Sequence, residues 1–125
     1  MIHEQGEECS RMLLPEEVEI SLYDTGGLEG LISHLPDDEV FASSYLLFRA
    51  LADPFRLKIL ALLAIQPLCV CVIRSVLEIS DSRLSYHLSI LKKAGLIAGE
   101  QSGTWIIYRL TEKGEQVRGM RAGVG

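Results

Sequence analysis

The sequence lacks the signatures of several classes of protein. No apolar run reaches the roughly 18 residues of a membrane-spanning helix, and no basic-then-apolar segment opens the chain. We therefore expect a cytoplasmic protein with no membrane partner. The chain also has no phosphate-binding glycine loop, no His-Glu-x-x-His metal motif and no evident nucleophile with its base, which argues against an enzyme.

Cysteine is scarce, with 3 in 125 residues: Cys9, Cys69 and Cys71. An odd number of cysteines in a chain without an export signal argues against a disulfide scaffold. It favours reduced thiols that bind a metal or undergo redox chemistry. The bland alternative is that the cysteines are small buried hydrophobes, since free cysteine is among the most buried residue types.

Acidic and basic residues are unevenly distributed along the chain, which has a formal net charge of −5. Residues 1–45 hold 11 Asp or Glu and 1 Arg, a balance of −10, whereas residues 46–125 hold 6 Asp or Glu and 11 Lys or Arg, a balance of +5. Affinity for nucleic acid depends on the local field where cations meet phosphates. The negative total therefore does not exclude a DNA-binding protein.

The length indicates one folded domain, which we place at residues 38–125 after an acidic N-terminal arm at residues 1–37. Proline and glycine interrupt the arm, and we expect one short helix in it at residues 28–35. Apolar residues at helical spacing then predict a helix around residues 38–51. Asp53 and Pro54 are typical of a helix start, and they open a nearly apolar helix that ends at Pro67.

The stretch around residues 80–110 carries the clearest pattern. Leu84, Leu88 and Leu91 recur at i, i+4 and i+7, so they form an apolar stripe on a helix that Ala94-Gly95 terminates. A shorter helix precedes it, and two strand-like segments joined by Ser102-Gly103 follow it. Helix, helix and hairpin in this order predict an α+β, mainly α, fold: a winged helix-turn-helix with a two-stranded hairpin wing.

The polar residues of this motif are candidates for contact with double-stranded DNA. The predicted contacts are Ser82, Arg83, Ser85, Tyr86, His87, Lys92, Lys93, Gln101 and Arg109. The lysines and Arg109 suit phosphates, and Gln101 belongs to the wing tip. Two alternatives stay open: the polar helix face could simply be solvated, and His87 could be a partly buried residue that holds the helix. Trp105 and Tyr108 are interpreted first as core residues.

Four segments can be compared with known families: Leu51–Leu60, Leu68–Cys71, Leu84–Ile97 and Gly103–Leu110. Their composition, order and spacing together resemble the ArsR/SmtB family of metal-responsive winged-helix repressors, over roughly residues 45–110. The resemblance implies a homodimer that binds a palindromic operator and leaves it when a toxic metal or metalloid binds.

Cys69 and Cys71 stand at the head of the first motif helix. Residues two apart in an ideal helix point about 200° from each other and could not share one ion. A distorted helix start can bring them together, and Pro67 just upstream favours such a start. Thiolates select soft ions, here As(III), Pb(II), Cd(II) or Zn(II).

A further ligand is needed, and the resemblance suggests where it lies. One branch of the family has a third cysteine close after the pair, where this chain has Arg74; another takes thiolates from the N-terminal arm, often of the other subunit. We therefore expect a metal site of Cys69, Cys71 and Cys9. Three sulfurs suit As(III) or Pb(II), and His3 or His34 could complete a tetrahedral Zn(II) or Cd(II) site.

Two departures from the family pattern bear on ligand binding and dimerisation. The family commonly has Asp where this chain has Val72, which leaves a ligand or hydrogen-bonding role unfilled. Its other common site uses Asp and His on the last helix, but residues 111–125 contain neither. Because that last helix is short, we expect the helix around residues 41–51 to carry much of the dimer contact.

We interpret the protein as a metal(loid)-responsive repressor. In each subunit of its dimer the second motif helix reads DNA, and ligation of the ion at the first motif helix changes the spacing between these two reading helices. Two alternatives remain. The thiols could form a redox switch in a repressor that senses no metal. The winged helix could also be a protein-interaction module that no longer contacts DNA.

Overall fold

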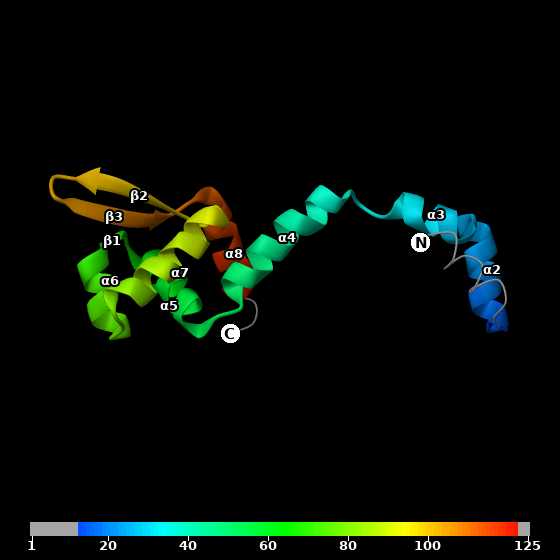
Figure 1. Cartoon of the computed structure of the whole chain (residues 1–125), viewed down its shortest axis with the longest axis horizontal. Coiled ribbons are helices and arrows are strands. Elements are labelled where there is room, and N and C mark those ends of the chain that lie inside the picture. The colour runs from blue at the N-terminus through cyan, green and yellow to red at the C-terminus, as the bar shows by residue number, and fades with distance from the viewer. Residues whose placement is uncertain (1–12, 123–125) are drawn as a thin grey trace. The chain divides into compact units, whose positions relative to one another are not determined.

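The computed structural model describes residues 13–122, with side chains up to Arg118 (Figure 1). The chain divides into two compact units at residues 1–38 and 39–125. Within the described residues no helix has the length and apolarity needed to cross a membrane.

The part of the first unit that the structure describes, from residue 13 on, contains the helices α2 (Glu16–Thr25) and α3 (Gly27–His34), and neither has a buried residue. The helix expected at residues 28–35 is present as α3, but the helix α2 before it was not expected. The reason lies at Gly26, whose φ of 102° is readily adopted only by glycine. Gly26 ends α2 and begins α3, so a residue that we interpreted as a breaker instead joins two helices.

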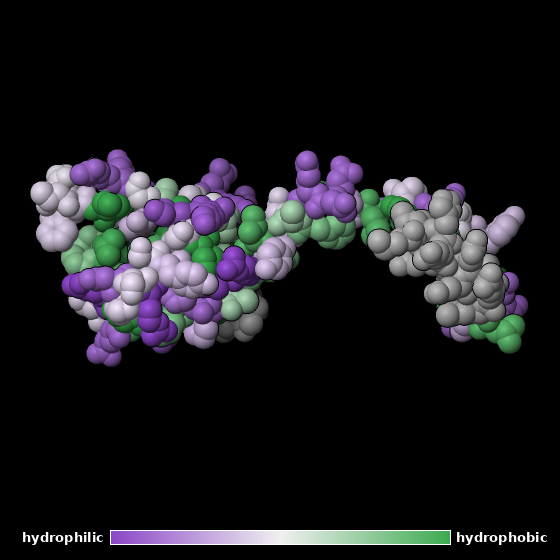
Figure 2. Space-filling view, in the orientation of Figure 1, coloured by the Kyte–Doolittle hydropathy of each residue, from purple (hydrophilic) through white to green (hydrophobic). Residues whose placement is uncertain are grey.

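The second unit begins with α4 (Asp38–Leu51) and α5 (Pro54–Ile65). The predicted start of α5 is confirmed, because the Asp53 carboxylate accepts hydrogen bonds from the backbone N–H groups of Phe55 at 2.8 Å and Arg56 at 3.2 Å. Along α4, large hydrophobic side chains remain exposed, and green atoms lie at the surface of this helix in Figure 2. The exposed side chains are Val40, Phe41, Tyr45, Leu46 and Phe48.

The motif itself follows as β1 (Leu68–Cys69), α6 (Val70–Leu77), α7 (Asp81–Lys93), β2 (Ile97–Ser102), β3 (Trp105–Leu110) and α8 (Glu112–Ala122). Gly95 follows α7 with a φ of 75°, as predicted for its role as a helix terminator. The antiparallel sheet has the order β1-β3-β2. The β2–β3 hairpin lies along α5, α6 and α7, with its turn far from α4 (Figure 1).

The hydrophobic core joins α5, α6, α7 and the sheet. Its fully buried large side chains are Ile59, Ile73, Leu84, Leu91 and Leu96. The predicted stripe Leu84, Leu88 and Leu91 is buried as expected, so the opposite face of α7 is turned to solvent.

The predicted winged helix-turn-helix is confirmed, with two corrections. The sheet has a third strand, β1, which pairs Leu68 with Tyr108 and Cys69 with Ile107. Trp105 is not a core residue: it begins β3 beside the hairpin turn and is 57% exposed, whereas Tyr108 is buried as expected.

Candidate DNA-binding surface and thiol site

The reading helix α7 presents most of its predicted contact residues to solvent. Ser82, Arg83, Ser85 and Tyr86 are exposed. The side chain of Ser80 caps the helix by accepting a hydrogen bond from the backbone N–H of Arg83 at 3.3 Å. The first turns of α7, where recognition helices commonly contact base edges, therefore carry a polar face with one arginine, Arg83.

The remaining predicted contacts lie at the end of α7 and on the wing. Lys92, Lys93 and Gln101 are exposed, and the side-chain amide of Gln101 donates a hydrogen bond to the backbone oxygen of Gly103 at 3.3 Å. Arg109 is exposed too, but its guanidinium pairs with the Glu100 carboxylate at 3.2 Å. A DNA phosphate would have to compete with that carboxylate for Arg109.

His87 is the exception among the predicted contacts. It is only 5% exposed, and its Nδ1 lies 2.9 Å from Nη1 of Arg56. The alternative interpretation, a residue that holds the helix, fits this position, and direct contact with bases does not. The prediction that His87 contacts DNA is therefore corrected: His87 is a buried residue that holds the helix.

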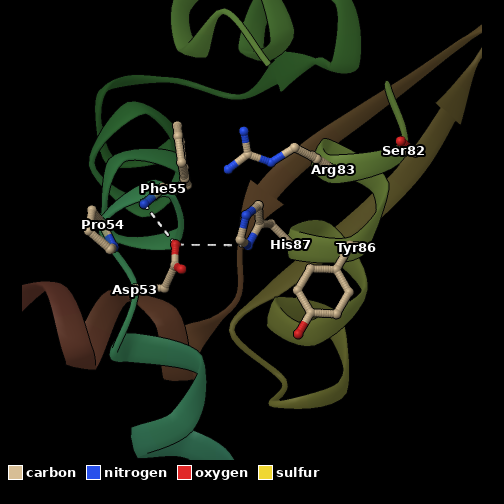
Figure 3. Close-up of a pocket in the computed structure, with 7 residues that line it drawn as sticks. All are labelled: Asp53, Pro54, Phe55, Ser82, Arg83, Tyr86 and His87. Atoms are coloured by element: carbon tan, nitrogen blue, oxygen red, sulfur yellow. Dashed lines mark hydrogen bonds and ion pairs between the residues drawn. The ribbon is translucent and has the colours of Figure 1, made fainter. Parts of the chain in front are cut away.

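A pocket of about 400 Å³ lies between the start of α5 and the first turns of α7 (Figure 3). His87 points across it toward Asp53, and the two atoms Nδ1 and Oδ1 are 3.9 Å apart. Burial raises the pKa of Asp53, but the hydrogen bonds from the backbone N–H groups of Arg56 and Phe55 and the charge of Arg56 outweigh it and leave that pKa below its ordinary value.

Arg56 is a buried residue that was not predicted from the sequence. This residue is 6% exposed although it carries a charge. The signal that could have found it is its spacing: Ile59, Leu60 and Leu63 follow it at i+3, i+4 and i+7, and all three are buried. An arginine in register with such a stripe must point into the core and find partners there.

The thiol site lies where β1 runs into α6. Cys69 has extended backbone angles, with φ −82° and ψ 160°, and it stands at the N-cap position of α6, whereas Cys71 belongs to the first helical turn. The two sulfurs are 2.9 Å apart. The sulfurs therefore meet because Cys69 lies in β1 with an extended backbone, and not because the helix itself is distorted as the sequence suggested.

The two thiols share a hydrogen bond that shifts their pKa values in opposite directions. The Cys71 thiol lowers the pKa of Cys69 by donating a hydrogen bond to its thiolate, and the backbone N–H of Val72 adds to the effect. The same hydrogen bond raises the pKa of Cys71, and burial and the Cys69 charge raise it further. Cys69 is therefore the first of the pair to become a nucleophile or metal ligand.

The donor set fits a soft ion in chemistry but is incomplete. A zinc–sulfur distance of about 2.3 Å in a tetrahedral site places two sulfurs about 3.8 Å apart, so Cys69 and Cys71 need only a small separation to hold one ion. No third His, Cys, Asp or Glu joins them within residues 13–122. Cys9 and His3 lie outside the described residues, and His34 Nδ1 bonds the backbone oxygen of Gly30.

The family is decided by comparison with known proteins. The family description "Bacterial regulatory protein, arsR family" matches residues 53–98, which run from the start of α5 to the start of the wing. The arsenical resistance operon repressor of Bacillus subtilis (strain 168) is 45% identical over 74 residues, which are 58% of this chain and 69% of that protein. The chain belongs to the arsR family.

Two further relatives bear on this arsR-family chain. The HTH-type transcriptional repressor SmtB of Mycobacterium tuberculosis (strain H37Rv) is 38% identical over 77 residues, 62% of this chain and 57% of that protein. The homodimeric winged helix-turn-helix DNA-binding domain of a Mycobacterium bovis protein superposes with a TM-score of 0.66 at 26% identity, covering 73% of this chain and 87% of that one. The arsR-family protein is thus a transcriptional regulator.

Proposed function

We propose that the protein is a metal(loid)-responsive repressor that binds operator DNA as a homodimer and releases it when a thiophilic ion binds Cys69, Cys71 and Cys9. The observation that carries the proposal is the 2.9 Å separation of the Cys69 and Cys71 sulfurs at the head of α6. The name of the Bacillus subtilis relative, an arsenical resistance operon repressor, supports a metalloid as one inducer.

The third sulfur decides between inducers. Cys69, Cys71 and Cys9 would hold As(III) or Pb(II) in a three-sulfur site, and one histidine added to them would suit Cd(II) or Zn(II). Thiols must lose their protons to bind such ions, so the lowered pKa of Cys69 favours capture and the proton held by Cys71 is released on binding.

The route from the thiols to the reading helix runs through α6. Arg74 on α6 pairs with Asp81 at the start of α7, with Nη1 and Oδ1 2.7 Å apart. Ile73 and Leu77 of α6 are buried in the same core as Leu84 of α7. A changed geometry at Cys69 and Cys71 can therefore shift the head of α6 and, through these contacts, the start of α7.

The exposed apolar side chains of α4 support the dimer. Phe41, Tyr45 and Phe48 are 50%, 64% and 59% exposed, an arrangement that a protein in water usually covers. We assign this face to the contact with a second copy, as the homodimeric Mycobacterium bovis domain suggests. Two reading helices in one dimer would then contact two half-sites of a palindrome.

The test follows DNA binding and sulfur ligation in the same sample. The reduced full-length protein selects a duplex from a random-sequence pool, and As(III), Pb(II), Cd(II) and Zn(II) are then titrated into the complex. We expect fluorescence anisotropy of the duplex to report release while sulfur-to-metal absorption, for Pb(II) and Cd(II), reports ligation. A coupling of about 1.4 kcal/mol would appear as a tenfold loss of affinity.

Matched variants locate the response. Cys69→Ser and Cys71→Ser should abolish release while leaving DNA affinity without ion unchanged, and Cys9→Ser tests the third ligand. Ser75→Ala is the control, because the Ser75 hydroxyl bonds the Cys71 backbone oxygen at 2.9 Å but supplies no sulfur. Normal release by the variant lacking both Cys69 and Cys71 would contradict the proposal.

A redox switch is the second candidate, because the same 2.9 Å contact favours it. Oxidation by a peroxide would remove two electrons and two protons from Cys69 and Cys71 and join their sulfurs, the peroxide being reduced to water or alcohol. Reversible loss of DNA binding after peroxide and recovery with dithiothreitol, without any response to the four ions, would favour this function.

A further inference from the structure

Arg56 ties three helices together from a buried position. Its Nε donates to the backbone oxygen of Ala50 at 2.8 Å, and its Nη2 donates to that of Arg49 at 3.0 Å, both at the end of α4. Its Nη1 lies 2.9 Å from Nδ1 of His87 on α7. A buried charge is tolerated when such partners surround it, and a cation suits the carbonyl end of a helix.

The contact fixes the protonation state of His87. A guanidinium can only donate, so Nδ1 of His87 must accept, and the ring is neutral with its hydrogen on Nε2. The charged groups that face the ring are Asp53 and Arg56 at the start of α5 and Arg83 on its own helix. Burial lowers the pKa of His87, the two arginines act in the same direction, and Asp53 opposes them.

His87 also supports residues of the exposed face of α7. The ring of Phe55 lies 5.6 Å from the His87 ring, and the Arg83 guanidinium lies 4.9 Å from the Phe55 ring centre. The Tyr86 ring meets the His87 ring edge-on at 5.4 Å. Figure 3 shows Arg83 extended toward Phe55, so two predicted DNA contacts pack around this buried pair.

We propose that Arg56 and His87 are positioning residues for DNA binding, whose hydrogen bond fixes the reading helix α7 against the end of α4 without either residue touching DNA. The inference rests on the proposed DNA-binding function and on α4 as the dimer helix. Since α4 would meet the partner copy and α7 would meet the duplex, this bond sets the orientation of one reading helix relative to the other.

Two substitutions at His87 separate the hydrogen bond from the volume of the ring. His87→Phe fills similar space but removes the acceptor, whereas His87→Asn keeps an uncharged acceptor near the position of Nδ1. With the duplex selected by the unmodified protein as probe, we expect His87→Phe to weaken binding by roughly tenfold or more and His87→Asn by about threefold at most. Sedimentation should find both variants dimeric.

A double-mutant cycle tests whether the two residues act as one unit. Arg56→Met and His87→Phe should each weaken DNA binding. The double variant should bind DNA with an affinity only slightly below that of the single variant with the lower affinity. Leu63→Ala is the control, because Leu63 is buried on the same face of α5 but makes no polar link to α4 or α7. Below its melting temperature this control should bind the duplex normally.

The dependence of DNA affinity on pH distinguishes this role from a purely structural one. At constant salt, the affinity of the unmodified protein should fall as pH drops through the lowered pKa of His87, which lies below the ordinary histidine value of 6.5, because a protonated His87 cannot accept from Arg56. His87→Asn should lack this part of the profile. Failure of the unmodified protein to enrich any duplex contradicts the proposed function; duplex affinity unchanged in His87→Phe overturns this inference alone.

Discussion

Two junctions of the winged helix-turn-helix differ in character. Where α5 meets α7, Arg56 and His87 are buried and every buried side-chain nitrogen or oxygen of the described residues has a partner. Where β1 meets α6, the thiol groups of Cys69 and Cys71 are half-buried and contact each other through their sulfurs. The comparison teaches that one junction is built to stay fixed, and the other can change geometry at low cost.

The largest effect is expected at the fixed junction. Arg56→Met leaves two carbonyl oxygens and His87 Nδ1 without their donor, and unsatisfied buried polar groups destabilise. We expect a loss of about 3 kcal/mol in the free energy of unfolding, measured by urea denaturation. A loss no larger than that of an exposed substitution such as Lys58→Met would show that this junction is not fixed by its hydrogen bonds.

Removal of the α5 cap at the same junction should cost less. Asp53→Ala deletes the acceptor of the Phe55 and Arg56 backbone N–H groups, which in other helices costs about 1 to 2 kcal/mol. Asp53→Asn is the matched variant, because its amide oxygen can still cap the helix. If both substitutions destabilise equally, the carboxylate charge and not the cap is what this junction needs.

The turn between the two motif helices offers a change of opposite sign. Glu78 ends α6 with a φ of 54°, a conformation that glycine adopts without strain. Glu78→Gly should stabilise the fold by about 0.5 to 1 kcal/mol in the same urea measurement. Glu78→Ala keeps the strain and serves as the control; a destabilising Glu78→Gly would mean that chain flexibility outweighs strain in this turn.

Acid should weaken the fixed junction first. The pKa of His87 is lowered in the folded state, mainly by burial, so the unfolded chain takes up this proton first as pH falls through about 6.5. The contribution of neutral His87 is complete above that pH and declines below it. Thermal unfolding from about pH 7.5 to about pH 5 should show the loss, and His87→Asn should show less of it. Equal profiles for the two proteins would assign the acid sensitivity to other groups.

The sequence predicted the elements of the motif well because their signals are local. The Asp53-Pro54 start, the Leu84 stripe and the Gly95 stop each depend on residues within a turn or two. What it could not predict depends on contacts distant in sequence. Burial of His87 depends on Arg56, 31 residues away, and β1 exists only because Leu68 and Cys69 pair with β3.

The smallest effect on stability is expected at the link from α6 to α7. Arg74 pairs with Asp81 at 2.7 Å, but both side chains are exposed, at 46% and 75%, and exposed ion pairs contribute little. Arg74→Gln should therefore leave the unfolding midpoint unchanged. The effect of Arg74→Gln should appear in the release of DNA on ion binding, because this pair connects α6 to the reading helix α7.

The comparison of the two junctions turns on that variant. If the junction of β1 and α6 acts on α7 through Arg74, then Arg74→Gln binds the ion with unchanged sulfur-to-metal absorption but releases DNA less completely. Asp81→Asn should behave in the same way, since it removes the other half of the pair. Unchanged release in both variants would leave the shared core around Ile73 and Leu77 as the route by which α6 moves α7.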